Sequence, residues 1–224
     1  GIPKQYLSIN NNKNYKSTSS NYKTIPKFEF IFCARLLISK GIKTFLELSR
    51  EFPSHNFIVF GERDISSKDS ITQESLNEFS KRKNVFIKGY KKDPLLNLTS
   101  KNPVLIVPSS YGEGMPRAIL EGFALKIPVI CSKSATCDLF TEQNLYISKG
   151  NKMEDYKLCI EKLFIDFSNG NLSKKLKFSQ NMSKNYSEDK IVKKTLSVYK
   201  QLLDFKTIPN IIKNNFKKSF NMLP

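Results

Sequence analysis

The chain reads PSSYGEGMPRAILE from Pro108 to Glu121, directly after the apolar run of residues 104–107. The apolar run predicts a buried strand, the two glycines predict a turn, and Pro116 is typical of the first position of a helix. Glu113 lies in the turn, and Glu121 lies in the helix among apolar residues. A carboxylate in such surroundings is costly unless a partner binds it. Hydroxyl-rich ligands are suitable partners, because a carboxylate readily accepts two hydrogen bonds.

Strand-like and helix-like segments alternate along the rest of the chain. Short apolar runs predict strands at Phe28–Ala34, Phe57–Phe60, Val85–Ile87, Val104–Val107, Pro128–Cys131 and Leu145–Ile147. Helices are predicted at Lys40–Phe52, at Ile71–Arg82, from Asp93-Pro94, and at Pro116–Leu125. Three more are expected at Lys152–Phe167, Leu172–Tyr186 and Glu188–Leu203. This order predicts an α/β fold, a Rossmann-like parallel sheet with helices on both faces and a C-terminal helical extension.

Ligands of such sheets bind at the carboxyl ends of the strands. Four loops lie at these ends and are expected to converge on one crevice: residues 35–41, 61–63, 89–92 and 109–115. The first loop carries two cations, since Arg35 ends the first strand and Lys40 opens the next helix. Two cations beside a helix N-terminus predict a diphosphate site. The alternative is a surface arginine and a solvated lysine.

The two glutamates allow more than one interpretation. Gly112 and Gly114 let the backbone approach a ligand closely, which favours hydroxyl binding by Glu113 and Glu121. Glu121 alone could instead be the ion-pair partner of Arg117, one helical turn before it. A third interpretation is a paired acid and base for glycoside hydrolysis, although nothing in the sequence marks either glutamate as a protonated acid.

Composition limits the classes of partner. The 224 residues carry a formal net charge of +17. Such a charge favours polyanions, namely nucleic acid, anionic lipid or phosphorylated small molecules, unless it only reflects a lysine-rich surface. Nucleic acid is disfavoured, because the basic residues are scattered and accompany no recognised nucleic-acid motif. No apolar run reaches the roughly 18 to 20 residues of a membrane span.

Metal binding is not predicted. His55 is the only histidine, and no zinc-ligand spacing joins the four cysteines, Cys33, Cys131, Cys137 and Cys159. Cysteines in apolar runs are typical of core positions in a reducing cytosol.

Three segments differ in character. Residues 1–27 are polar and rich in Asn, Lys and Ser, and we expect a linker or the remnant of an interdomain segment there. Residues 28–203 form the predicted α/β domain. Residues 204–224 are basic and partly apolar, which predicts an amphipathic tail suited to an anionic interface or to packing on another domain.

The stretch from Pro108 to Ala124, followed by Pro128-Val129-Ile130, resembles the signature of GT-B glycosyltransferases of family four, a glutamate, seven residues and a second glutamate. Three further segments share the resemblance: Arg35 with Lys40-Gly41, Phe60-Gly61, and Phe86-Ile87-Lys88-Gly89. It covers roughly residues 28–203. The resemblance implies one half of a GT-B fold, the half that binds a nucleotide diphosphate sugar, in a family that retains anomeric configuration and needs no metal or other cofactor.

Matching positions imply roles for single residues. Arg35 and Lys40 would hold the diphosphate and stabilise the departing nucleotide, and Glu113 would bind donor sugar hydroxyls; these three are the candidate catalytic residues. Glu121 would bind the ribose. The other candidate substrate-binding positions are Gly61, Gly112, Gly114, Met115 and Pro116. The backbone N–H groups of Gly114 and Met115 would help to hold the donor, whereas Pro116 has no N–H to offer.

The chain departs from the family pattern in three respects. Lys126 stands where the family commonly has glycine, and residues 134–138 replace a Gly-Gly turn that leads to a glutamate. The N-terminal domain, which would supply the acceptor site, is missing from this sequence. We therefore expect the chain to bind donor weakly and to transfer nothing without that domain.

Residues 111–117 resemble members that build capsule, O-antigen or other lipid-linked glycans. This implies a glycan or polyprenyl-linked acceptor, a role in cell-surface polysaccharide synthesis, and a cytoplasmic protein with peripheral contact at the inner face of the membrane. The alternatives are a non-catalytic nucleotide-sugar-binding subunit and a basic module that binds nucleic acid or another polyanion.

Overall fold

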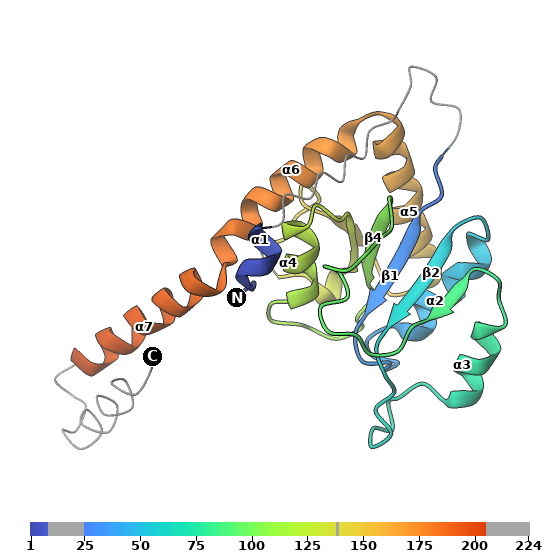
Figure 1. Ribbon diagram of the computed structural model, residues 1–224, viewed down its shortest axis with the longest axis horizontal. Helices are drawn as coiled ribbons and strands as arrows, with labels where there is room; N and C mark the ends of the chain where they lie inside the picture. The colour runs from blue at the N-terminus through green and yellow to red at the C-terminus, as the bar shows by residue number, and fades with distance from the viewer. Residues whose placement is uncertain (9–24, 138, 205–224) are drawn as a thin grey trace.

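A computed structural model describes residues 1–8, 25–137 and 139–204 of the chain. Its centre is a six-stranded sheet with helices on both faces (Figure 1). The strands are β1 (Glu29–Cys33), β2 (Asn56–Phe60), β3 (Val85–Ile87), β4 (Pro103–Val107), β5 (Val129–Ser132) and β6 (Tyr146–Ser148). They lie in the order β3-β2-β1-β4-β5-β6, and every neighbouring pair is parallel. The predicted fold class is confirmed.

From residue 42 onward the helices follow the predicted order, except at Asp93-Pro94. The helices are α1 (Lys4–Ser8), α2 (Ile42–Glu51), α3 (Gln73–Ser80), α4 (Arg117–Ala124), α5 (Met153–Ser168), α6 (Asn171–Ser183) and α7 (Glu188–Asp204), with short 3-10 turns η1 (Lys133–Ala135) and η2 (Lys184–Tyr186). Helices α2 to α7 match predicted segments to within about three residues at each end.

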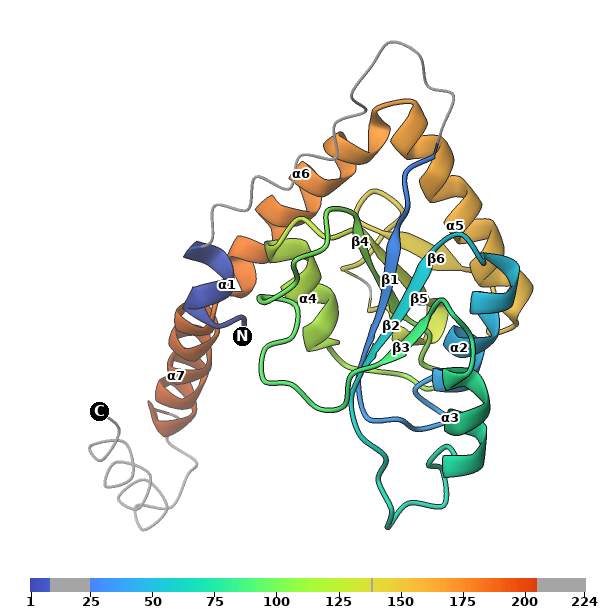
Figure 2. The same cartoon turned by 45° about the vertical axis from the view of Figure 1, so that its right-hand side comes forward.

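The sheet separates two hydrophobic clusters. On β1, Phe30 and Phe32 pack in the cluster that includes α2, α3 and α5, whereas Ile31 packs in the cluster that includes α4. All three side chains are fully buried. Figure 2 shows α4 on one side of the sheet and α2 and α5 on the other. Because successive side chains of a strand point to opposite faces, this run of apolar residues requires helices on both sides.

The helix predicted from Asp93-Pro94 is absent from the described residues, and the prediction was wrong. The chain forms only a turn there, closed by the N–H of Leu96 donating to the carbonyl of Asp93 at 3.1 Å. Asp93 has a φ of 49°, whereas an N-cap residue needs an extended backbone. Its carboxylate accepts hydrogen bonds from Gln5 and Tyr6 instead of capping a helix.

The first eight residues of the predicted linker pack against the rest of the fold. Ile2 pairs with Ser187 in a parallel bridge, and its N–H donates to the carbonyl of Tyr186 at 2.8 Å. Ile2 and Tyr6 are buried in the same hydrophobic cluster as the core face of α4. Residues 9–24 lie outside the described part.

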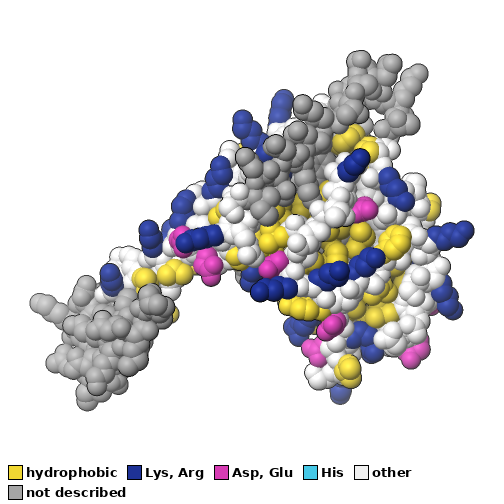
Figure 3. Space-filling view, viewed as in Figure 1, with side chains coloured by type: hydrophobic (Ala, Val, Ile, Leu, Met, Phe, Trp, Pro, Cys, Tyr) yellow, Lys and Arg dark blue, Asp and Glu magenta, His cyan; other side chains and the backbone are white. Residues whose placement is uncertain are grey.

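Helix α7 leaves the body of the fold (Figure 1). One side of it is apolar, and Val192, Val198, Tyr199 and Leu202 are each between 42% and 52% exposed. Figure 3 shows hydrophobic side chains on α7 with basic ones beside them. Residues 205–224 of the predicted tail lie outside the described part of the chain. None of the helices that the structure describes is long and apolar enough to cross a membrane.

Candidate functional site

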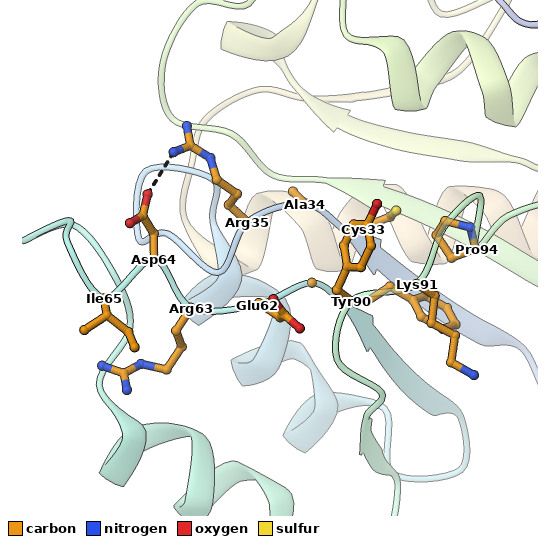
Figure 4. A pocket seen from close by; sticks show the side chains of 12 residues that line it. Cys33, Ala34, Arg35, Glu62, Arg63, Asp64, Ile65, Tyr90, Lys91 and Pro94 are labelled. Carbon is orange, nitrogen blue, oxygen red and sulfur yellow. Dashed lines mark hydrogen bonds and ion pairs between the residues drawn. The ribbon is translucent and has the colours of Figure 1, made fainter.

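Two adjoining cavities open at the carboxyl ends of the strands. The larger, of about 540 Å³, lies at the ends of β1, β2 and β3, and its lining includes Arg35, Gly61 and Tyr90 (Figure 4). The smaller, of about 210 Å³, lies between β1 and β4 and is lined by residues of the Pro108–Glu121 stretch together with Lys40. Both cavities include Cys33 and Ala34, so the four predicted loops do meet at one edge of the sheet.

A lysine and a glutamate form an ion pair in the smaller cavity. Lys40 Nζ lies 2.8 Å from Glu113 Oε1, and each side chain is only 18% exposed. The ammonium also lies 4.6 Å from the centre of the Tyr111 ring. Burial alone would lower the pKa of Lys40, but hydrogen bonds to Glu113 and Tyr111 raise it overall. Lys40 is therefore held in position and is charged at neutral pH.

The backbone brings this pair together across two loops. Gly41 has a φ of 79° and lies against the carbonyl of Pro108, where the glycine-rich stretch begins. The N–H of Ser110 donates to the carbonyl of Ser39 at 2.8 Å, and the hydroxyls of both Ser109 and Ser110 reach that same carbonyl. The loop after β1 and the loop after β4 are thus tied together beside Lys40.

Arg35 lies in the larger cavity with a partner of its own. Its Nη1 lies 3.0 Å from Asp64 Oδ2, on the loop after β2 (Figure 4). A hydrogen bond from Ser66, and then the one from Arg35, lower the pKa of Asp64. The Arg35 side chain is 64% exposed, so solvent weakens the pair and the guanidinium remains available to an anion.

Glu121 is the most enclosed of the charged candidate residues, at 8% exposed. Its Oε1 accepts a hydrogen bond from Arg117 Nε at 2.6 Å, so the ion pair considered from the sequence is present. The pKa of Glu121 is raised overall, and burial is the largest cause. Arg117 and Tyr6 each lower this pKa, whereas Asp93 raises it. Glu121 is not among the residues that line the two cavities, but Arg117 lines the smaller one.

Replacing Glu121 by glutamine is expected to favour the stability of the protein more at neutral pH than at acidic pH. A carboxyl whose pKa rises on folding above its ordinary 4.5 gives up stability as the pH rises through the folded-state value. Glutamine does not titrate, so the Tm of Glu121→Gln relative to wild type should increase by about 1 to 3 °C between pH 4 and pH 8. Thermal unfolding at both pH values measures this. A relative loss of Tm in the variant would mean that the Arg117 pair outweighs burial.

The remaining candidates divide into two groups. Gly61 lines the larger cavity and Pro116 the smaller one. Gly112, Gly114 and Met115 are exposed and line neither. A Cβ added to either of these two glycines would meet no atom within 4 Å, so the structure itself does not require glycine there.

Two acidic residues and one tyrosine at this edge were missed from the sequence. They are Asp64, which accepts a hydrogen bond from Arg35, Asp93, whose charge acts on Glu121, and Tyr6, which donates a hydrogen bond to Asp93. Each is distant in sequence from its partner and belongs to no motif. Within the part of the chain that the structure describes, no cluster of three or more His, Cys, Asp or Glu residues could hold a metal ion.

A parallel sheet with cavities at its carboxyl edge defines a Rossmann-like domain, and such sheets bind ligands at that edge. The chain belongs to the family of glycosyl transferases group 1, whose family model matches residues 17–189. An uncharacterised glycosyltransferase of Methanocaldococcus jannaschii is 31% identical over 121 residues, which are 51% of this chain and 29% of the relative.

Solved glycosyltransferases share the fold. A glycosyltransferase from Rickettsia africae has a TM-score of 0.68 at 20% identity, over 80% of this chain and 48% of that one. HepE of Anabaena, solved with UDP and glucose, has a TM-score of 0.64 at 15% identity, over 80% of this chain and 49% of that one. Sucrose-phosphate synthase of Thermosynechococcus elongatus has a TM-score of 0.67 at 19% identity, over 80% and 46%. The chain thus has a GT-B-like domain and spans about half the length of these structures.

Proposed function

We propose that this chain is the donor-binding half of a retaining glycosyltransferase of family four, which transfers a sugar from a nucleotide diphosphate sugar. The observation that carries the proposal is the Lys40–Glu113 pair, enclosed in a cavity that adjoins Arg35. A cation for phosphate and a carboxylate for hydroxyls are what a sugar diphosphate needs side by side. HepE, which shares the fold, was solved with UDP and glucose.

In this proposal the cations act on the leaving group. Negative charge grows on the nucleotide diphosphate as the sugar bond breaks, and cations already in place stabilise that charge without reorganisation. Lys40 and Arg35 would supply the cations, assisted by the N–H groups of Gly114 and Met115. Glu113 would exchange its bond with Lys40 for hydroxyls of the donor sugar. No metal or other cofactor is assigned a role.

A second domain would complete the active site. This chain spans only about half the length of the solved structures named above, and α7 exposes an apolar face that an additional domain would cover. We place the acceptor, a glycan or polyprenyl-linked molecule of cell-surface polysaccharide synthesis, between the two domains. The basic residues would favour a cytoplasmic enzyme at the inner face of the membrane. The chain alone would bind donor and transfer nothing.

A non-catalytic nucleotide-sugar-binding subunit is the second candidate, because this chain covers only half of its structural relatives. The two candidates share the donor site and differ in what happens when the second domain is supplied. Only the first predicts sugar transfer by the combined protein.

A binding panel tests the donor site. Calorimetry with UDP-, GDP- and ADP-sugars should find at least one ligand for the wild-type chain. Arg35→Ala and Glu121→Ala should each weaken its binding by more than tenfold, about 1.4 kcal/mol. A wild type that binds none of these ligands, yet binds DNA with a steep salt dependence, would favour a polyanion-binding module instead.

A further inference from the structure

The loop after β2, residues 61–72, packs along the loop after β1 that carries both candidate cations. Leu37 and Ser70 form an antiparallel bridge, and the N–H of Ile38 donates to the carbonyl of Asp69 at 2.7 Å. Figure 4 shows the first residues of the loop after β2 lining the larger cavity. The far end of the same loop therefore lies against the turn that leads into α2.

Asp69 holds the residue that precedes Lys40. The N–H of Ser39 lies 3.2 Å from each carboxylate oxygen of Asp69, and the Ser39 hydroxyl donates to Oδ2. A carboxylate that accepts from a backbone N–H makes a charge-assisted bond, stronger than a bond between neutral groups. The carbonyl of Ser39 accepts from the N–H of Ser110 at 2.8 Å and from the hydroxyls of Ser109 and Ser110. Ser39 thus joins the loops after β1, β2 and β4.

The bonds of Ser39 reach the ion pair but not the space for a ligand. Neither Asp69 nor Ser39 lines the two cavities, so the carboxylate would act through Lys40 and not on a ligand. The Lys40 ammonium lies 4.6 Å from the centre of the Tyr111 ring, on the loop that Ser39 holds. A shift of the peptide before Lys40 would therefore move the ammonium relative to Glu113. Displacements of about 1 Å are enough to impair such a site.

We propose that Asp69 is a positioning residue of the donor site, which sets the place of the Lys40 ammonium by holding Ser39 against the loop after β4. This rests on the proposed donor function. A cation that is already in place costs little to order when a phosphate binds. Removing the carboxylate leaves the N–H and hydroxyl of Ser39 to water, so the turn loses its fixed position.

Affinity for nucleoside diphosphates tests the proposal in the full 224-residue chain. Calorimetry with UDP, GDP and ADP should show about tenfold weaker binding in Asp69→Ala, for whichever of them wild type binds. Asp69→Asn keeps one oxygen acceptor and should lose only about threefold. Loss of a negative charge alone would strengthen diphosphate binding, so weaker binding identifies a change of position.

A double-mutant cycle shows whether the effect passes through Lys40. In a Lys40→Met background, Asp69→Ala should weaken binding less than about twofold, because the group that it positions is gone. A general loss of packing would cost the same in both backgrounds. Without ligand, the ¹H–¹⁵N NMR signal of the Lys40 ammonium, assigned by its absence from Lys40→Met, should shift or broaden in Asp69→Ala.

The matched control is Asp155→Ala. It removes another carboxylate that accepts from a backbone N–H, that of Lys152 at 3.1 Å, away from both cavities. This variant should change neither the affinity nor the Lys40 signal.

The outcomes separate the positioning role from the donor function. If wild type binds a nucleotide but both Asp69 variants keep its affinity, or the loss is as large in the Lys40→Met background, the positioning role is overturned and the donor site stands. An unchanged Lys40 signal in Asp69→Ala would overturn it as well. If wild type binds no nucleotide, the donor function fails and the positioning role fails with it, whatever the signal shows.

Discussion

Replacing Lys40 by methionine is expected to weaken nucleotide-sugar binding by more than about 100-fold, or about 2.7 kcal/mol. Methionine keeps most of the length of the side chain and removes the ammonium, which is held 2.8 Å from Glu113 in a cavity that is mostly closed to water. The loss has two parts. The diphosphate loses a charge-assisted hydrogen bond, and the Glu113 carboxylate is left unpaired where it repels the phosphates. Isothermal titration calorimetry measures the change.

Two further variants separate these effects. Lys43→Met removes the same charge from the exposed side of α2, three residues away, and should change affinity less than about twofold. Adding Glu113→Gln to Lys40→Met removes the stranded carboxylate and should recover part of the lost diphosphate affinity. Equal losses in Lys40→Met and Lys43→Met would indicate only long-range attraction to a basic surface, and the diphosphate site would be wrong.

The strands of the sheet could be predicted from the sequence because the local pattern of apolar residues agrees with their burial in the structure. Short apolar runs such as Val104–Val107 have few alternatives to a buried strand, and the glycine and proline that flank α4 mark its start. Since carboxyl ends of parallel strands share one edge, Lys40 and Glu113 could be placed together without coordinates. Their ion pair is a finding of the structure that the sequence analysis did not predict.

Contacts between segments without local pattern could not be predicted. Tyr6 lies in a polar stretch, and its burial depends on the bridge between Ile2 and Ser187. No hydrophobic periodicity in the sequence predicts that bridge. Asp93 has a good helix-start sequence, but its carboxylate is used by α1 instead. Tertiary partners outweighed local propensity in both places. The pairing of Arg35 with Asp64 likewise depends on the path of the loop after β2.

Replacing Gly41 by alanine is expected to destabilise the protein by about 3 kcal/mol and to lower its Tm by about 6 to 12 °C. Gly41 has a φ of 79°, which costs an alanine about 1 kcal/mol. A Cβ at this position would lie only 2.1 Å from the carbonyl oxygen of Pro108. Backbone cannot rotate aside as a side chain can, so the loops after β1 and β4 must separate. Thermal unfolding measures the loss.

Gly170→Ala is the matched control, because Gly170 has a φ of 73° but a Cβ there would meet no atom within 4 Å. Gly170→Ala should lose only about 1 kcal/mol of folding stability, the cost of placing alanine at a positive φ. The difference between the two variants measures the contact between Gly41 and Pro108. That contact sets the distance from Lys40 to Glu113, so Gly41→Ala should also weaken donor binding at temperatures where it remains folded. Equal Tm losses in the two variants would show that the two loops can separate freely, and the geometry of the ion pair would then need another cause.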